Sequence, residues 1–267
     1  MAILTFVIPV RHPENAANWQ ALKGRLAEAL RSISAQTDAD WEGVVVANRG
    51  SDLPPMPQRF RVEAVDFPPN PLHEMTEDAR ERVYEAFRLD KGRRVLAGML
   101  SMRSSQYFMI CDDDDFVSNR LAGFVREHAG QPGWTLAQGY VWSEGSRFVY
   151  IADNFAKLCG TSHIVRADLY GLPASMAEAS EDYMKRRLGS HVSIDDDLRA
   201  AGAPLDNLPF QGAVYRIGHA GAHSKSTGLL RSYVLQKGFL KHPRRLVRNL
   251  SRFRRIDDRI GREFFGR

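Results

Sequence analysis

The 267-residue sequence has only two cysteines, Cys111 and Cys159, and no long apolar run. Two cysteines cannot form the disulfide framework of a small secreted domain, so we expect both to stay reduced in a cytosol. No stretch approaches the ~20 consecutive apolar residues that a membrane-spanning helix requires. The apolar run Ile3–Val10 follows no basic region and contains Pro9, so it does not resemble a secretory signal. These absences predict a cytoplasmic protein, or a peripheral protein at the inner face of a membrane.

A net positive charge is also absent from most of the chain. Residues 231–267 contain 12 Lys or Arg and 3 Asp or Glu, whereas the whole chain has a net charge of only +5. The first 230 residues are therefore acidic, with a net charge of −4. A nucleic-acid-binding domain needs a basic surface, so we expect no nucleic-acid partner.

In the basic tail, arginines alternate with apolar residues from Pro243 onward. The apolar residues are Leu246, Leu250, Phe253, Ile260 and Phe264. Such a pattern predicts a basic amphipathic helix. Its apolar face would bind an anionic membrane, the main domain, or a second subunit in a homodimer, and the sequence leaves these alternatives open. We accordingly divide the chain into a main domain, residues 1–230, and a helical tail, residues 231–267.

Apolar and amphipathic segments alternate along the first half of the chain. Leu4–Val10 and Gly43–Ala47 are apolar runs typical of buried strands, and Phe60–Val65 alternates as a third strand does. Apolar residues over 19–33 recur at helical spacing. The other expected elements are helices at 73–89, 93–102, 119–128, 176–188 and 195–201, a hairpin at 135–151, and strands at 162–166 and 213–217. This order predicts an α/β fold with a mostly parallel central sheet flanked by helices.

Four aspartates, Asp112–Asp115, directly follow the apolar segment Tyr107–Cys111. That segment predicts a buried strand, and ligands of open α/β sheets bind at the carboxyl ends of the strands. Adjacent carboxylates repel one another unless protonation, solvent or a bound cation relieves the repulsion. Carboxylate oxygens suit hard divalent cations. The pattern indicates a metal or ligand site, although an acidic loop that caps the next helix through Asp115 or Ser118 would give the same sequence.

Several short motifs occur along the chain in a specific order. They are Pro9-Val10, Ala29–Thr37, Val45–Ser51, Lys91–Arg94, Cys111–Asp115, Gly160–Arg166, Ile194–Leu198, and Tyr215-Arg216 with the later His219, His223 and Ser226. Each motif alone is weak, but their order and spacing over residues 3–228 resemble the family-2 glycosyltransferases of the GT-A fold, of the bacterial surface-glycan type. The resemblance implies an inverting enzyme that moves a sugar from a nucleotide-diphosphate donor to a hydroxyl group of a glycan or glycolipid.

The same resemblance implies roles for individual residues. Donor binding would involve Pro9, Val10, Arg11, Asn48, Lys91, Arg93, Arg94, Asp112 and Asp113. The ligands of a Mn²⁺ or Mg²⁺ ion would be Asp112, Asp114 and one or both of His219 and His223. A sugar hydroxyl needs a general base when it attacks, and this role would fall to Asp195 or Asp196. We expect the neighbouring aspartates to raise the pKa of Asp195.

Two positions depart from the family pattern. Ala47-Asn48 stands where an aspartate usually contacts the nucleobase, so the identity of the nucleotide stays open. Ile194 stands where a glutamate usually begins the acidic motif, so the general base stays open between Asp195 and Asp196.

Three other functions fit part of the pattern. A haloacid-dehalogenase-like phosphatase also has an aspartate after a buried strand, but usually close to the N-terminus rather than at a position such as Asp112. A sugar nucleotidyltransferase would normally carry a glycine-rich basic loop after the first strand, where Arg11-His-Pro-Glu14 stands here. An inactive glycosyltransferase-like binding subunit would share the fold, but the presence of both acidic motifs argues against it.

Overall fold

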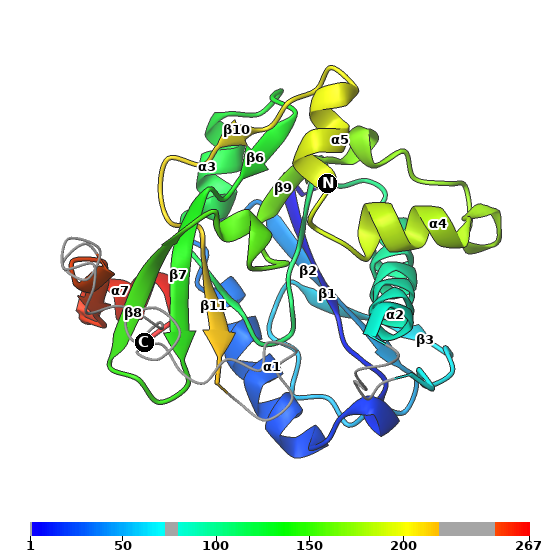
Figure 1. Ribbon diagram of the computed structural model, residues 1–267, viewed down its shortest axis with the longest axis horizontal. Coiled ribbons are helices and arrows are strands. Elements are labelled where there is room, and N and C mark those ends of the chain that lie inside the picture. Colours follow the sequence, from blue (N-terminus) through cyan, green and yellow to red (C-terminus); the bar gives the residue numbers. More distant parts are fainter. Residues whose placement is uncertain (1, 73–79, 219–248) are drawn as a thin grey trace.

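The computed structural model describes residues 2–72, 80–218 and 249–267 as a mixed α/β structure (Figure 1). Its central sheet has seven strands in the order β10-β6-β9-β4-β1-β2-β3. In that order they span Asp206–Asn207, Gly133–Thr135, His163–Arg166, Tyr107–Ile110, Leu4–Pro9, Trp41–Asn48 and Phe60–Val65. Strand β9 runs antiparallel to its neighbours β4 and β6, and the other pairings described in this sheet are parallel. The predicted α/β class with a mostly parallel central sheet is confirmed.

Alternate residues of the central strands face two different apolar layers. Phe6 and Val45 pack with helix α1, which spans Trp19–Ser34. Val7 and Val44 pack with helix α2, which spans Arg80–Ser101. Successive side chains of a strand point to opposite faces of the sheet. Helices α1 and α2 therefore cover opposite faces of the central sheet (Figure 1).

A second sheet has five strands in the order β12-β8-β7-β11-β5. In that order they span Phe253–Arg255, Phe148–Asp153, Gln138–Ser143, Ala213–Ile217 and Phe116–Val117. Strands β7 and β8 form the predicted hairpin, although Thr135 belongs to β6. Strand β5 directly follows the four aspartates and leads to helix α3, Leu121–Glu127. This second sheet is not among the sequence predictions, and it is built on β7, which pairs with both β8 and β11.

Helix α2 is continuous, so the prediction of two separate helices is wrong over residues 80–101. Gly92 lies inside this helix without ending it. A Cβ atom on Gly92 would lie 2.0 Å from the carbonyl oxygen of Met184, so glycine lets α2 approach the segment Met184–Leu188 closely. The predicted helix at 176–188 is instead a 3₁₀ turn, Met176–Glu178, a short helix α4, Glu181–Tyr183, and a π-helical turn, Met184–Leu188.

The described part of the basic tail is not a continuous helix. Phe253–Arg255 forms β12, antiparallel to β8, and helix α7 spans Asp258–Phe264. Ile260 and Phe264 are buried in an apolar cluster with side chains of the second sheet. The predicted helix is therefore wrong at Phe253–Arg255, where strand pairing overrides the helical spacing. It is confirmed at Asp258–Phe264, where the apolar side chains pack on the second sheet, one of the alternatives that the sequence left open. Leu246 and the proposed domain boundary at residue 230 lie outside the described residues. Within the described ranges, no helix is long and apolar enough to cross a membrane.

Candidate active site

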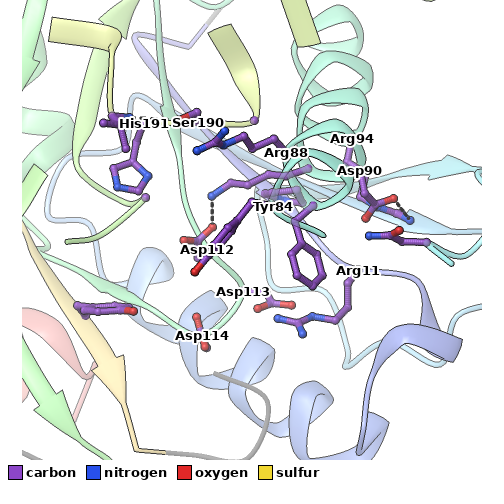
Figure 2. Close-up of a pocket in the computed structure, with 18 of the residues that line it drawn as sticks. Arg11, Tyr84, Arg88, Asp90, Arg94, Asp112, Asp113, Asp114, Ser190 and His191 are labelled. Carbon is purple, nitrogen blue, oxygen red and sulfur yellow. Dashed lines mark hydrogen bonds and ion pairs between the residues drawn. The ribbon is translucent and has the colours of Figure 1, made fainter. Parts of the chain in front are cut away.

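A pocket of about 580 Å³ lies where the carboxyl ends of β1 and β4 approach helix α2 (Figure 2). Pro9 and Arg11 come from the end of β1, and Asp112, Asp113 and Asp114 follow β4. Helix α2 contributes Tyr84, Phe87, Arg88, Asp90, Lys91 and Arg94. Asn15, Asn70, and parts of the segments 157–160 and 189–192 and of strand β11 complete the wall. The position at the strand ends is where open α/β sheets bind ligands.

The four aspartates do not all have the same role. Asp115 is only 2% exposed, and its backbone N–H donates to the carbonyl of Asp112, which closes a turn. The Thr161 hydroxyl accepts a hydrogen bond from the Asp112 N–H at 2.9 Å and donates to Asp115 Oδ2 at 2.7 Å. Cys159 Sγ and the Arg216 backbone N–H also donate to the Asp115 carboxyl group, both at 3.1 Å. Asp115 therefore fixes the turn to the protein interior, and the other three aspartates line the pocket.

Burial and mutual repulsion perturb the carboxyl groups of this turn. The pKa of Asp113 is raised to about 6. Burial is the largest cause, the charges of Asp114 and Asp112 add to it, and the Arg11 guanidinium opposes it. The pKa of Asp115 lies well above its usual range, first because of burial and then because of Asp114 and Asp112. Figure 2 shows the Asp113 carboxyl group beside the Arg11 guanidinium. Such a concentration of carboxyl groups favours a positively charged ligand.

Lys91 forms an ion pair with Asp112 across the pocket (Figure 2). Burial opposes the positive charge of Lys91, but the Asp112 carboxylate outweighs this effect, and the pKa of Lys91 is raised. The pair lies against the backbone of Gly160, where a Cβ atom would come within 2.7 Å of Lys91 Nζ. The sequence therefore places a small residue where the ion pair needs room.

The predicted donor-binding residues fall into two groups. Pro9, Arg11, Lys91, Arg94, Asp112 and Asp113 line the pocket, whereas Val10, Asn48 and Arg93 are not among its lining residues. Asn48 accepts a hydrogen bond from buried Arg94 at 2.8 Å and donates to the Phe67 carbonyl at 2.7 Å. Arg93 pairs with Asp90 and donates to the Pro68 carbonyl. These contacts join Asn48 and Arg93 to other parts of the protein and do not test donor binding. The donor-binding role of both residues therefore stays a prediction.

The predicted base Asp195 lies at the start of helix α5, Ile194–Ala200, and does not line the pocket. Its Oδ2 accepts a hydrogen bond from Thr135 Oγ1 at 3.0 Å and lies 3.4 Å from His163 Nε2. Burial raises the pKa of Asp195, but the interactions with His163 and Thr135 outweigh it, and the pKa is lowered. The expected rise is therefore wrong, because the hydrogen-bond partners stabilise the carboxylate more than burial disfavours it. Asp196 is exposed and also lies away from the pocket wall.

Several residues of the pocket lie outside the sequence predictions. Tyr84, Phe87 and Arg88 share one face of α2 with the predicted Lys91, at a helical spacing that is visible in the sequence. Ser190 and His191 come from a segment without a recognisable motif. No spacing rule would have placed them beside Asp112, because the approach of α2 to the π-helical turn brings them there.

The carboxylate oxygens of the acidic turn are suitable ligands for a hard divalent cation. Mg²⁺ and Mn²⁺ prefer this ligand type, and a cation would offset the repulsion that raises the pKa of Asp113. Among the residues that the structure describes, no three His, Cys, Asp or Glu side chains are grouped to hold a metal ion. The predicted ligands His219 and His223 lie outside the described residues. Asp112 and Asp114 are thus the described candidates, and phosphate oxygens of a ligand could complete the shell.

No protein-family model and no curated protein matches the sequence. Solved structures with a related chain path include TarS 1–349 of S. aureus, at 12% identity and a TM-score of 0.41, covering 81% of this chain and 60% of that one. The chain spans only 37% of a longer TarS chain. A putative nucleotide-diphospho-sugar transferase from Desulfovibrio desulfuricans matches at 10% identity and a TM-score of 0.37, and the match covers 93% of this chain and 98% of that one. All these TM-scores are below 0.5, so the fold class rests on the strand order described above.

Proposed function

We propose that this protein is a metal-dependent, inverting glycosyltransferase with a GT-A-type fold, which transfers a sugar from a nucleoside diphosphate to a hydroxyl group of a glycan or glycolipid. The observation that carries the proposal is the pocket at the ends of β1 and β4. Asp112–Asp114 line it together with the basic side chains of Arg11, Arg88 and Lys91. Lys91 pairs with Asp112, and the Arg11 guanidinium lies beside the Asp113 carboxyl group (Figure 2). The pocket volume of about 580 Å³ lies within the usual range of small-molecule binding pockets, so a nucleotide sugar would fit.

The basic side chains would bind the diphosphate. Arginine donates charge-assisted hydrogen bonds that match the geometry of phosphate oxygens, so Arg11 and Arg88 are the proposed phosphate contacts. Lys91 holds the Asp112 carboxylate and adds a positive charge to the same wall. Tyr84 and Phe87 offer aromatic surface for the nucleobase or the sugar ring. These groups would orient the donor before any bond breaks.

Negative charge develops on the diphosphate as the bond to the anomeric carbon breaks. When bound, a divalent cation supplies Lewis-acid stabilisation of that charge, and Asp112 and Asp114 are the residues proposed to hold it. Arg11 and Lys91 stabilise the same charge through their own positive groups. The acceptor hydroxyl would attack from the face opposite the leaving group and invert the anomeric centre. Asp195 and Asp196 remain the candidates for the general base that accepts the proton of this hydroxyl group, as the family resemblance implies. Asp195 does not line the pocket, so it would have to accept the proton through another group that lies between it and the acceptor.

Calorimetric titration of uridine, guanosine and thymidine diphosphates, with Mn²⁺ and with EDTA, tests the donor site. We expect one nucleotide to bind in Mn²⁺ and to bind at least about tenfold more weakly to Asp114→Asn, a loss of ~1.4 kcal/mol. Asp168→Asn is the control, because Asp168 pairs with Arg166 and does not line the pocket. Equal binding in EDTA, and equal binding by Asp114→Asn, would refute the donor-binding proposal.

The products separate this function from its rivals. A glycosyltransferase without its acceptor releases free sugar and a nucleoside diphosphate from the donor at a low rate. A phosphatase would release inorganic phosphate from phosphate monoesters, and a sugar nucleotidyltransferase would form pyrophosphate from a nucleoside triphosphate and a sugar phosphate. An inactive subunit would bind the nucleotide and release nothing.

The exposed arginines of the tail are proposed to bring the enzyme to an anionic membrane that carries the acceptor. Arg254, Arg255 and Arg259 are exposed, whereas Ile260 is buried in the protein. Membrane contact would therefore depend on charge, at about 1 kcal/mol for each basic residue near an anionic surface. We expect a triple Arg→Ser variant at these positions to co-sediment more weakly with anionic vesicles.

The matched control carries Arg→Ser changes at Arg49, Arg61 and Arg82, which are exposed elsewhere on the protein. Both variants lose the same total charge, so the difference between them isolates the position of the charge. Equal vesicle binding by the two variants would contradict a role for the tail. Light scattering on the same samples shows whether a homodimer forms instead.

A further inference from the structure

A second, smaller cavity of about 10 Å³ lies directly beside the pocket. The two share Lys91, Gly160, Ser190 and His191 in their walls. The remaining polar side chains of the small cavity come from His163 and Tyr170, and the other lining residues are apolar. This volume is close to the minimum that one water molecule needs.

Two polar atoms on this wall are buried without a partner. The Tyr170 hydroxyl and His191 Nε2 have no hydrogen bond to any described residue, and both are hidden from solvent. Native proteins almost always satisfy buried polar atoms, by a protein group or by an ordered water. A water site needs at least two polar groups and enough space. Tyr170 and His191 both line this cavity, and its volume is close to that of one water molecule.

We propose that this cavity binds one water molecule, which accepts a hydrogen bond from the Tyr170 hydroxyl and donates one to His191 Nε2. The ring of His191 suits this role. Burial and the nearby charge of Lys91 lower the pKa of His191 to about 4, so the ring is neutral at physiological pH. A neutral imidazole has one N–H donor and one acceptor nitrogen. Nε2 is the buried ring nitrogen without a partner, so in the proposed arrangement Nε2 is the acceptor and Nδ1 carries the proton.

The water connects two segments whose side chains make no direct hydrogen bond in the described structure. One is the pocket-lining segment that carries His191, and the other is the 3₁₀ turn Ala167–Tyr170. His163, on the same cavity wall, lies 3.4 Å from Asp195. The acidic start of α5 is therefore one side chain away from a cavity that adjoins the pocket.

A crystal structure of the full chain, at a resolution that shows ordered waters, tests the proposal directly. We expect a density peak about 2.7–3.2 Å from both the Tyr170 hydroxyl and His191 Nε2. Tyr170→Phe removes one partner and should lose the peak. Tyr183→Phe should keep it, because the Tyr183 hydroxyl donates to the Tyr170 carbonyl and does not line the cavity. A direct bond between Tyr170 and His191, or no peak in the unaltered protein, would overturn the proposal.

Nitrogen NMR of the unaltered protein gives a second readout that needs no variant. We expect the Nδ1–H tautomer of His191 with an unprotonated Nε2, and the opposite tautomer would overturn the assignment of donor and acceptor. Neither readout uses nucleotide binding or turnover. A failure here is therefore distinct from a failure of the glycosyltransferase proposal.

Discussion

Replacing Thr161 with valine will test how the acidic turn is held in place. Valine keeps the branched shape of threonine and removes only the hydroxyl group. Thr161 is fully buried, and its hydroxyl bonds both the Asp112 N–H and the Asp115 carboxyl group. The variant leaves both groups without this partner at the point where the turn meets the protein interior.

The expected loss follows from the two hydrogen bonds. A bond between neutral groups contributes about 0.5–1.5 kcal/mol, and one to a charged group about 1.5–3 kcal/mol. Cys159 and the Arg216 backbone still donate to Asp115 in the variant. We therefore expect the free energy of unfolding to fall by roughly 1–4 kcal/mol, and the lower part of this range applies to a protonated Asp115, whose raised pKa favours the neutral form. We also expect weaker nucleotide binding, because the same turn presents Asp112–Asp114 to the pocket.

Urea denaturation followed by tryptophan fluorescence measures the change, with the slope against urea unchanged if the folded state is intact. Thr37→Val is the control, since the exposed Thr37 hydroxyl donates only to the Asn119 carbonyl, at 3.1 Å. Its loss should stay within about 0.5 kcal/mol, as is usual for surface positions. If Thr161→Val loses no more stability than Thr37→Val, the hydroxyl does not anchor the turn and our account of Asp115 is wrong.

Two further predictions concern the pocket and the acidic helix. Gly160→Ala places a methyl group 2.6 Å from Asp112 Oδ2 and 2.7 Å from Lys91 Nζ, so we expect it to displace the ion pair and weaken nucleotide binding in calorimetry. Unchanged affinity would show that the pair lies outside the binding site. The folded-state pKa of Asp195 lies below its ordinary value of 3.8, so this group stabilises the fold above that pH and loses its effect as the pH falls through the folded-state pKa. Asp195→Asn should therefore destabilise the protein at neutral pH but not in strong acid, and a pH-independent difference in urea denaturation would contradict this.

The elements that the sequence predicted well are those with local signals. The apolar run Leu4–Pro9 and the strands Phe60–Val65 and Ala213–Ile217 lie within a residue of the predicted bounds. Each is recognised by a pattern within a few residues, and the same holds for the aspartates after β4. Local patterns decide the type of an element, because burial of one or both faces dictates the spacing of its apolar residues.

The division of roles within the acidic run depends on distant residues. Asp115 is held by Thr161, 46 residues away, and by the backbone of Arg216, 101 residues away. In the sequence all four aspartates look alike, so a search for an Asp-x-Asp pattern cannot separate the anchor from the ligands. The same limit applies to Asp195, whose lowered pKa depends on Thr135 and His163 from two other strands.

The C-terminal residues complete the interior of the second sheet. The Phe265 ring lies 4.6 Å from that of Phe116 and 5.5 Å from that of Trp142, measured between ring centroids. A shortened chain that stops before residue 253 would expose these aromatic rings and leave β8 as an unpaired sheet edge, and both changes promote aggregation. Limited proteolysis that removes this end should therefore yield insoluble fragments. For the same reason, a purification tag attached after Arg267 needs a flexible spacer, whereas surface loops of the hairpin tolerate insertions more readily.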